Sequence, residues 1–132
     1  KILYIIILYK LNIRIGITTD ENNNLIKLED SRYFVIFDDE TKKEERYDSP
    51  AYKITPKGQA RDVGMDELLK YKPEMMVITS DSLCKCTYAT SLLAKVRYIL
   101  IDEKMNAKDI ENRINEFKNK ALDVLEPELY NR

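Results

Sequence analysis

The sequence predicts an α/β domain: a mixed sheet of about five strands with helices on its faces. Three observations support this fold class. Segments with alternating apolar residues, typical of strands, occupy the first half of the chain. The apolar spacing then changes to that of helices, and in the second half strands alternate with helices as in βαβ units.

The first half predicts three consecutive antiparallel strands. Ile13, Ile15 and Ile17 alternate with other residues until the polar cluster at 19–24, which predicts a loop. Short connections favour antiparallel pairing of the strands that follow, and the last of them is charged, as edge strands often are. The expected strands of this half are 13–18, 33–38 and 44–48.

Residues 49–59 predict an irregular surface loop, because Pro50, Pro56 and Gly58 interrupt regular structure. From Asp62 the spacing predicts a helix that Pro73 ends. The apolar side of this helix carries Met65, Leu68 and Leu69, and a strand at 75–79 follows it.

The next helix is expected to be capped by Ser80, Asp81 or Ser82. Its predicted buried face carries Leu83, Cys86, Thr90 and Leu93, and a strand follows at 97–101. A final helix starts at Asn106 with Asp109 as a capping partner. Its predicted buried stripe consists of Ile110, Ile114, Phe117 and Ala121. Three antiparallel strands followed by βαβ crossovers, with helices on both faces, form the ribonuclease-H-like three-layer layout.

The apolar run at 2–8 is much shorter than the ~20 residues that a membrane helix needs, so no membrane partner is expected. The run predicts either an extra edge strand or coding sequence upstream of Leu11. We divide the chain into an N-terminal apolar extension at 1–11, a single α/β domain at 12–125 and a C-terminal tail at 126–132, which is expected to fray beyond Pro127.

Composition excludes several classes of function. The 132 residues carry 22 basic and 23 acidic side chains, a formal charge of −1, so a nucleic-acid partner is not expected. Two cysteines separated by one residue do not make a secreted disulfide framework, which predicts a cytoplasmic protein. Histidine is absent, and with it the commonest general base and metal ligand. The Lys-, Glu- and Ile-rich composition predicts a thermophilic source.

Four segments carry a family resemblance: the opening strand at 13–20, the aromatic second strand at 31–38, the helix and strand at 66–79 and the closing helix at 106–117. Together they cover about 12–117 and resemble the NifX/NafY/NifB C-terminal type of domain, the dinitrogenase iron–molybdenum cofactor-binding (biosynthesis) family. The chain differs from the family's usual pattern at 27–30 and 61–64, where members commonly carry histidine, and at 80–84, where they have a glycine-rich turn.

This resemblance implies a non-enzymatic domain that holds an iron–sulfur or iron–molybdenum cofactor, or its precursor, or a relative whose ligand has changed. Cys84 and Cys86 are the candidate metal ligands, because iron, clusters and soft metals select thiolates. Both can bind one ion only if 82–86 is a loop, since residues two apart on a helix point in different directions. In the alternative, Cys86 packs in the core and Cys84 is an ordinary thiol near the helix start.

A second group of polar residues should lie together if the first and fourth strands are neighbours. These residues could hold a small anion through hydroxyl and backbone N–H groups, or they could simply cap a helix and close a turn. A carboxylate among them would instead favour a cation. The candidate cofactor-binding residues are Thr18, Thr19, Asp20, Ser80, Asp81 and Ser82.

The leading hypothesis is thus a small domain that is not an enzyme. It binds a metallocofactor, an iron–sulfur precursor or another small anionic ligand in the crevice beyond the first and fourth strands. A protein-interaction module is the alternative, with 2–8 pairing to a protein partner or a second copy. A third hypothesis is a divalent-metal nuclease using Asp20, Asp38 and Asp81, although its first strand lacks an acid.

Overall fold

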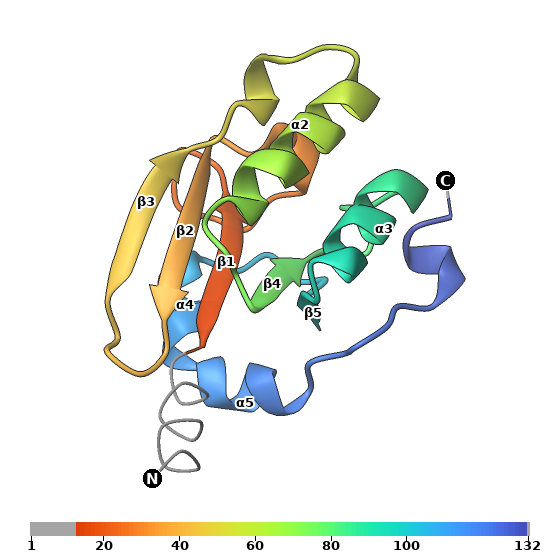
Figure 1. Cartoon of the computed structure of the whole chain (residues 1–132). Helices are drawn as coiled ribbons and strands as arrows, with labels where there is room; N and C mark the ends of the chain where they lie inside the picture. Colours follow the sequence, from red (N-terminus) through yellow and green to blue (C-terminus); the bar gives the residue numbers. More distant parts are fainter. Residues whose placement is uncertain (1–12, 132) are drawn as a thin grey trace, which may run out of the picture.

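The computed structural model describes residues 13–131, so the predictions for the run at 2–8 and for Leu11 lie outside the described residues. Its centre is one five-stranded sheet of order β3-β2-β1-β4-β5, shown in Figure 1. The strands are β1 (Arg14–Thr19), β2 (Tyr33–Asp38), β3 (Glu44–Asp48), β4 (Met75–Ile78) and β5 (Arg97–Leu100).

The sheet is mixed, as the sequence predicts. β1 pairs antiparallel with β2, and β2 pairs antiparallel with β3. β1 also pairs parallel with β4, and β4 pairs parallel with β5. β1 is therefore the central strand and joins the antiparallel half of the sheet to the parallel half.

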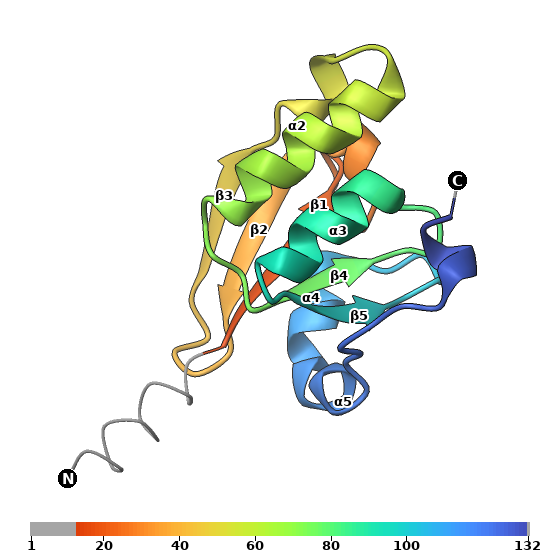
Figure 2. The same cartoon turned by 45° about the vertical axis from the view of Figure 1, so that its right-hand side comes forward.

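Helices cover both faces of the sheet, which confirms the predicted α/β architecture. Figures 1 and 2 show α2 and α3 on one face and α4 and α5 on the other. The helices are α2 (Lys57–Leu69), α3 (Lys85–Leu93), α4 (Ala107–Asn112) and α5 (Ile114–Asn119), with short 3-10 turns at η1 (Leu28–Asp30), η2 (Ala51–Lys53) and η3 (Pro127–Leu129). Within residues 13–131, no helix has both the length and the apolar content that crossing a bilayer demands.

Each face of the sheet carries its own core, because successive strand residues point to opposite sides. Ile15 and Ile17 of β1 pack in the cluster that includes Ile110 of α4. Gly16 faces the other side, where a Cβ would lie 3.1 Å from a methyl carbon of Leu68 on α2. Glycine at this position lets α2 pack closely against the central strand.

The start of α2 differs from the sequence prediction. The helix begins at Lys57, five residues before the predicted Asp62. Pro56 and Gly58 favour an irregular loop in the sequence, but Pro56 has extended backbone at the N-cap, where its missing N–H costs nothing. Gly58 lies in the first turn with open space around its Cα.

The predicted cap of α3 is wrong, and its predicted buried face is right only for Leu83, which is buried but precedes the helix. Its N-cap is Cys84 rather than one of residues 80–82. The residues of the helix that are buried are Thr87, Tyr88 and Ser91, whereas Leu93 is 86% exposed. Small hydroxyl side chains occupy this interface because they find partners: Ser91 Oγ donates to the carbonyl of Tyr88 (2.9 Å) and lies 2.5 Å from the Tyr98 hydroxyl.

The closing helix is divided at Arg113, the residue that ends α4 and caps α5. The predicted buried stripe survives the break, since Ile110, Ile114 and Phe117 are all buried. Residues beyond Pro127, for which the sequence predicts fraying, are packed instead. There η3 leads to Tyr130, whose ring stacks on that of Tyr88 with 4.1 Å between centroids.

Candidate functional site

The site begins where the parallel strands β1 and β4 end. Because the two strands are parallel neighbours, the residues that follow Thr19 and Ile78 leave the sheet at the same edge. The predicted segments 18–20 and 80–82 therefore both lie at this carboxyl edge. The alternation along β1 places Thr18 on the side of α2 and Thr19 on the side of α4.

On the β1 side of this edge, two of the three predicted side chains have structural hydrogen bonds. Thr18 Oγ1 donates to the carbonyl oxygen of Ile26 (2.6 Å). Asp20 Oδ1 accepts from the backbone N–H groups of Asn22 and Asn24, both at 2.9 Å, and so shapes the loop after β1. Thr19 Oγ1 is buried and has no hydrogen-bond partner among the described residues.

On the β4 side, residues 79–82 form a tight turn. Thr79 Oγ1 donates to Asp81 Oδ1 (2.5 Å) and lies 2.9 Å from Ser82 Oγ. Ser82 is buried, and its backbone N–H donates to the carbonyl of Thr79 (3.2 Å). The N–H of Ser80 donates to Asp102 Oδ1 (2.8 Å), which ties this turn to the end of β5. These residues organise the turn rather than cap a helix.

Cys84, the N-cap of α3, lies two residues after this turn. Its backbone N–H donates to Thr87 Oγ1 (2.9 Å), and its sulfur lies 3.4 Å from the same hydroxyl. The two residues thus form a reciprocal cap in which the thiol takes the place that serine or threonine usually fills. The side chain is partly exposed, so the thiol is accessible at the helix N-terminus.

Two further residues, which sequence reasoning missed, complete the site. Arg61 of α2 lies beside the Cys84 thiol, and its guanidinium pairs with Glu29 of η1 through bonds of 3.0 and 3.3 Å. Glu29 is only 4% exposed. The sequence contains no signal for this pair, because its members are 32 residues apart; they meet because α2 packs on η1.

Electrostatics make the Cys84 thiol easier to ionise than an ordinary cysteine. Burial alone would raise the pKa of its thiol, but hydrogen bonds with Thr87, the Arg61 guanidinium and the helix N-terminus together hold the pKa below the ordinary value. Glu29 stabilises the charged guanidinium, which raises the pKa of Arg61 further. A thiolate beside a fixed cation can ligate a soft metal or contact an anionic group.

Cys86 is placed differently from Cys84. It is exposed and lies within α3, so the two thiols are not both in a loop, the condition for their binding one ion. The prediction that Cys86 packs in the core is wrong. Among residues 13–131, no three Cys, Asp or Glu side chains gather as a metal-binding group. A bare metal ion usually needs four protein ligands, which these residues do not supply. They fit better a cluster or an anion that brings ligands of its own.

The acidic trio behind the nuclease hypothesis does not assemble. Asp38 ends β2, which runs antiparallel to β1, and it pairs in register with Arg14 at the start of β1. Asp38 therefore lies at the opposite edge of the sheet from Asp20 and Asp81. The antiparallel pairing separates carboxylates that a two-metal mechanism would need within a few ångströms.

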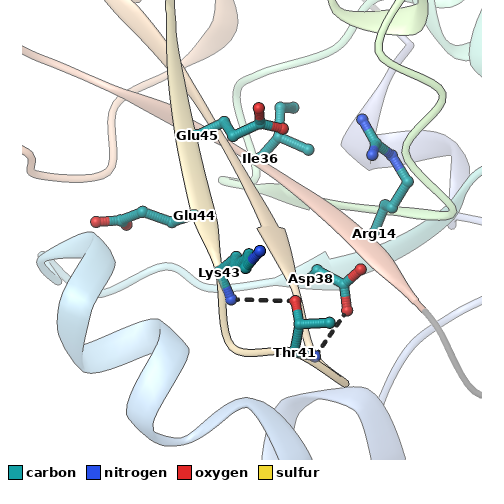
Figure 3. Close-up of a pocket in the computed structure, with 7 residues that line it drawn as sticks. All are labelled: Arg14, Ile36, Asp38, Thr41, Lys43, Glu44 and Glu45. Atoms are coloured by element: carbon teal, nitrogen blue, oxygen red, sulfur yellow. Dashed lines mark hydrogen bonds between the residues drawn. The ribbon is translucent and has the colours of Figure 1, made fainter.

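A hollow of about 400 Å³ lies at that opposite edge and is shown in Figure 3. Two of its charged groups already have partners in the fold: Arg14 donates to the carbonyl of Tyr71 (2.6 and 3.0 Å), and Asp38 Oδ1 accepts from two N–H groups of the following turn. The residues that line it are Arg14, Ile36, Asp38, Thr41, Lys43, Glu44 and Glu45. We therefore place the candidate site at Cys84 and not in this hollow.

Comparison with known proteins shows the fold alone. No family model matches the chain, and no curated protein matches it. The apo form of the orange protein from Desulfovibrio gigas is similar, with 15% identity and a TM-score of 0.64 over 78% of this chain and 87% of that one. A NifB-like protein of the DUF35 family from Thermotoga has 16% identity and a TM-score of 0.63 over 91% of this chain and 97% of that one.

Proposed function

We propose that the chain is a small non-enzymatic domain that binds a metallocofactor, an iron–sulfur precursor or another small anionic ligand at the carboxyl edge of β1 and β4. The observation that carries this proposal is the Cys84 thiol, accessible at the start of α3 beside Arg61. When deprotonated, such a thiol supplies one soft ligand, while the guanidinium and the positive end of the helix dipole favour negative charge.

The fold comparisons support the proposal indirectly. The orange protein was determined as an apo form, which implies that the orange protein also has a ligand-bound form. The other neighbour is a NifB-like protein. Both are compatible with the resemblance of the sequence to the iron–molybdenum cofactor-binding family. We propose membership of that family, with its ribonuclease-H-like fold, on this combined basis.

The residues would have separate roles. Cys84 would ligate the metal, with Cys86 as a second thiol if the first turn of α3 opens. Arg61 would balance the negative charge of the ligand. Ser80, Ser82 and Thr19 would orient the ligand through hydroxyl and backbone groups, and Asp81 would disfavour ligands whose negative charge comes close to that turn.

Anaerobic reconstitution of the full chain with iron and sulfide tests this function. We expect a stoichiometric chromophore that the Cys84→Ser/Cys86→Ser double variant does not form. The Cys86→Ser single variant is the matched control and should keep most of the iron, because Cys86 is exposed and lies within α3. Equal, negligible iron in the wild-type protein and the double variant would show that the thiols hold no cofactor.

A protein-interaction module is the second candidate, and two exposed apolar side chains favour it. Leu93 is 86% exposed and Val124 is 66% exposed. If this candidate is right, sedimentation will show a mass that rises with concentration, and deletion of residues 1–10 or the change Leu93→Asp will lower it. A constant monomer mass in all three proteins would exclude self-association.

A further inference from the structure

A pair of carboxyl groups lies between the edge strand β3 and helix α4, away from the candidate site. Glu44 begins β3, and Glu111 lies in the last turn of α4. Figure 3 shows the Glu44 side chain leaving β3 on the opposite side from Glu45. The side chain of Glu111 is only 8% exposed, and its Oε2 atom is buried without a hydrogen-bond partner among the described residues.

One lysine forms ion pairs with both carboxyl groups. Lys108 forms a close ion pair with Glu44, and its Nζ lies 3.7 Å from Glu111 Oε1. A hollow of about 330 Å³ lies beside the pair, and Lys42 lines it together with Lys108 and Glu111. The positive charge of Arg46 on β3 helps to lower the pKa of Glu44. Both Glu111 and Lys108 belong to α4, whereas Glu44, Lys42 and Arg46 come from the antiparallel half of the sheet. The remaining residues that line the hollow are Phe37, Asn112, Ile114 and Asn115.

We infer that Glu44 and Glu111 share one proton, and that loss of this proton loosens α4 from β3, so that the contact is a pH-sensitive clasp. A single exposed ammonium balances one carboxylate, and a second buried carboxylate without a donor is costly. A proton on the pair removes that cost, because Glu111 can then donate to Glu44. Burial and the neighbouring Glu44 raise the pKa of Glu111 to about 8, which places the change near neutral pH.

The clasp is connected to the candidate site through the start of α4. Asn106, the N-cap of this helix, donates from Nδ2 to the carbonyl of Asn22 (3.2 Å), and the N–H of Ala107 donates to the carbonyl of Asn23 (2.8 Å). Asn22 and Asn23 belong to the loop that Asp20 shapes at the end of β1. Movement of α4 should therefore reach this loop, whether or not a ligand is bound.

Carboxyl-carbon NMR of the full chain across pH 5 to 9.5 tests the clasp directly. In the wild-type protein we expect the Glu111 carboxyl to titrate with a midpoint near 8, and the amide signals of Asn22, Asn23 and Lys108 to shift with the same midpoint. Glu111→Gln fixes the neutral form and should abolish the common midpoint. Glu44→Gln should move the Glu111 midpoint towards the ordinary glutamate value, because it removes the repelling charge.

Glu116→Gln is the matched control, since Glu116 forms an exposed ion pair with Arg113 and should leave the midpoint unchanged. A Glu111 carboxyl that titrates at the ordinary value would overturn the shared proton. Amide signals of 22–24 that ignore the Glu111 titration would overturn the connection to the site. Because Glu44→Gln and the wild-type protein each give a result, the inference is tested even if Glu111→Gln fails to fold.

Discussion

At the scale of single residues, Arg61 connects stability with the candidate chemistry. Its guanidinium neutralises the buried Glu29 on one side and faces the Cys84 thiol on the other. An arginine suits this position because its planar fork can bond both carboxylate oxygens and retain a full positive charge. Changing it should therefore have two separate effects, one on folding and one on the thiol.

The first effect is on stability. Arg61→Met leaves Glu29 buried without its counter-charge, and we expect this to lower the free energy of unfolding by about 2–3 kcal/mol. Urea denaturation measures the loss. Lys70→Met is the control on the same helix, because Lys70 pairs with Glu67 at the surface and such pairs contribute about 1 kcal/mol or less. Equal losses in the two variants would contradict the role of the Arg61–Glu29 pair.

The second effect is on the thiol. In a Cys86→Ser background, the rate of alkylation of Cys84 should follow a titration midpoint below that of an ordinary cysteine, because Thr87 and Arg61 lower the pKa of the Cys84 thiol despite its burial. Arg61→Gln should raise this midpoint, and Lys70→Gln should leave it unchanged. Mass spectrometry of iodoacetamide-treated protein at several pH values gives the midpoint. An ordinary value in the parent protein would count against an activated thiol.

At the scale of elements, the strands could be predicted from the sequence and the faces of the helices only in part. Period-two alternation is local, so β2 and β3 match their predicted bounds. The buried face of α3 could not be predicted, because Ser91 is buried through a hydrogen bond with the Tyr98 hydroxyl of β5, which the fold brings near. The carboxyl edge of β1 and β4 could be predicted, because it follows from the expected order of the strands. The Arg61–Glu29 pair could not, because its members are 32 residues apart and meet only in the fold.

The contact between α4 and β3 should make stability depend on pH. The pKa of Glu111 is about 8 in the folded protein and near its ordinary value of 4.5 when unfolded, so the folded state binds more protons between these values. Its contribution to stability should therefore be complete below about pH 4.5 and be lost as pH rises through about 8. Thermal unfolding of wild type and Glu111→Gln across this range measures the difference, which should grow in favour of the variant at high pH.

At the scale of the whole molecule, the C-terminal segment completes one of the two cores. Leu125 is buried, its N–H donates to the Tyr88 hydroxyl oxygen (3.0 Å), and Tyr130 covers the Tyr88 ring. The segment also closes the side of β5, because Tyr98 and Leu122 exchange two backbone hydrogen bonds of 2.8 Å. The packed part of the chain thus extends past 125, where the sequence predicts a tail.

Removal of residues 127–132 should destabilise the protein by about 1–2 kcal/mol, because it exposes the face of Tyr88. Thermal unfolding of the truncated chain gives the loss. Tyr130→Ala in the full chain is the companion variant and should account for most of it, since its ring makes the stacking contact. A truncated protein as stable as the full chain would mean that the segment only rests on the surface.

The central position of β1 has a consequence for how the molecule opens. Its amides and carbonyls bond to β2 on one side and to β4 on the other, so neither half of the sheet can separate while β1 keeps both partners. Local fluctuations can release β3 or β5, but the amide hydrogens of β1 should exchange with solvent only when the whole domain unfolds. The slowest-exchanging amides are therefore expected along the seam between the antiparallel and parallel halves.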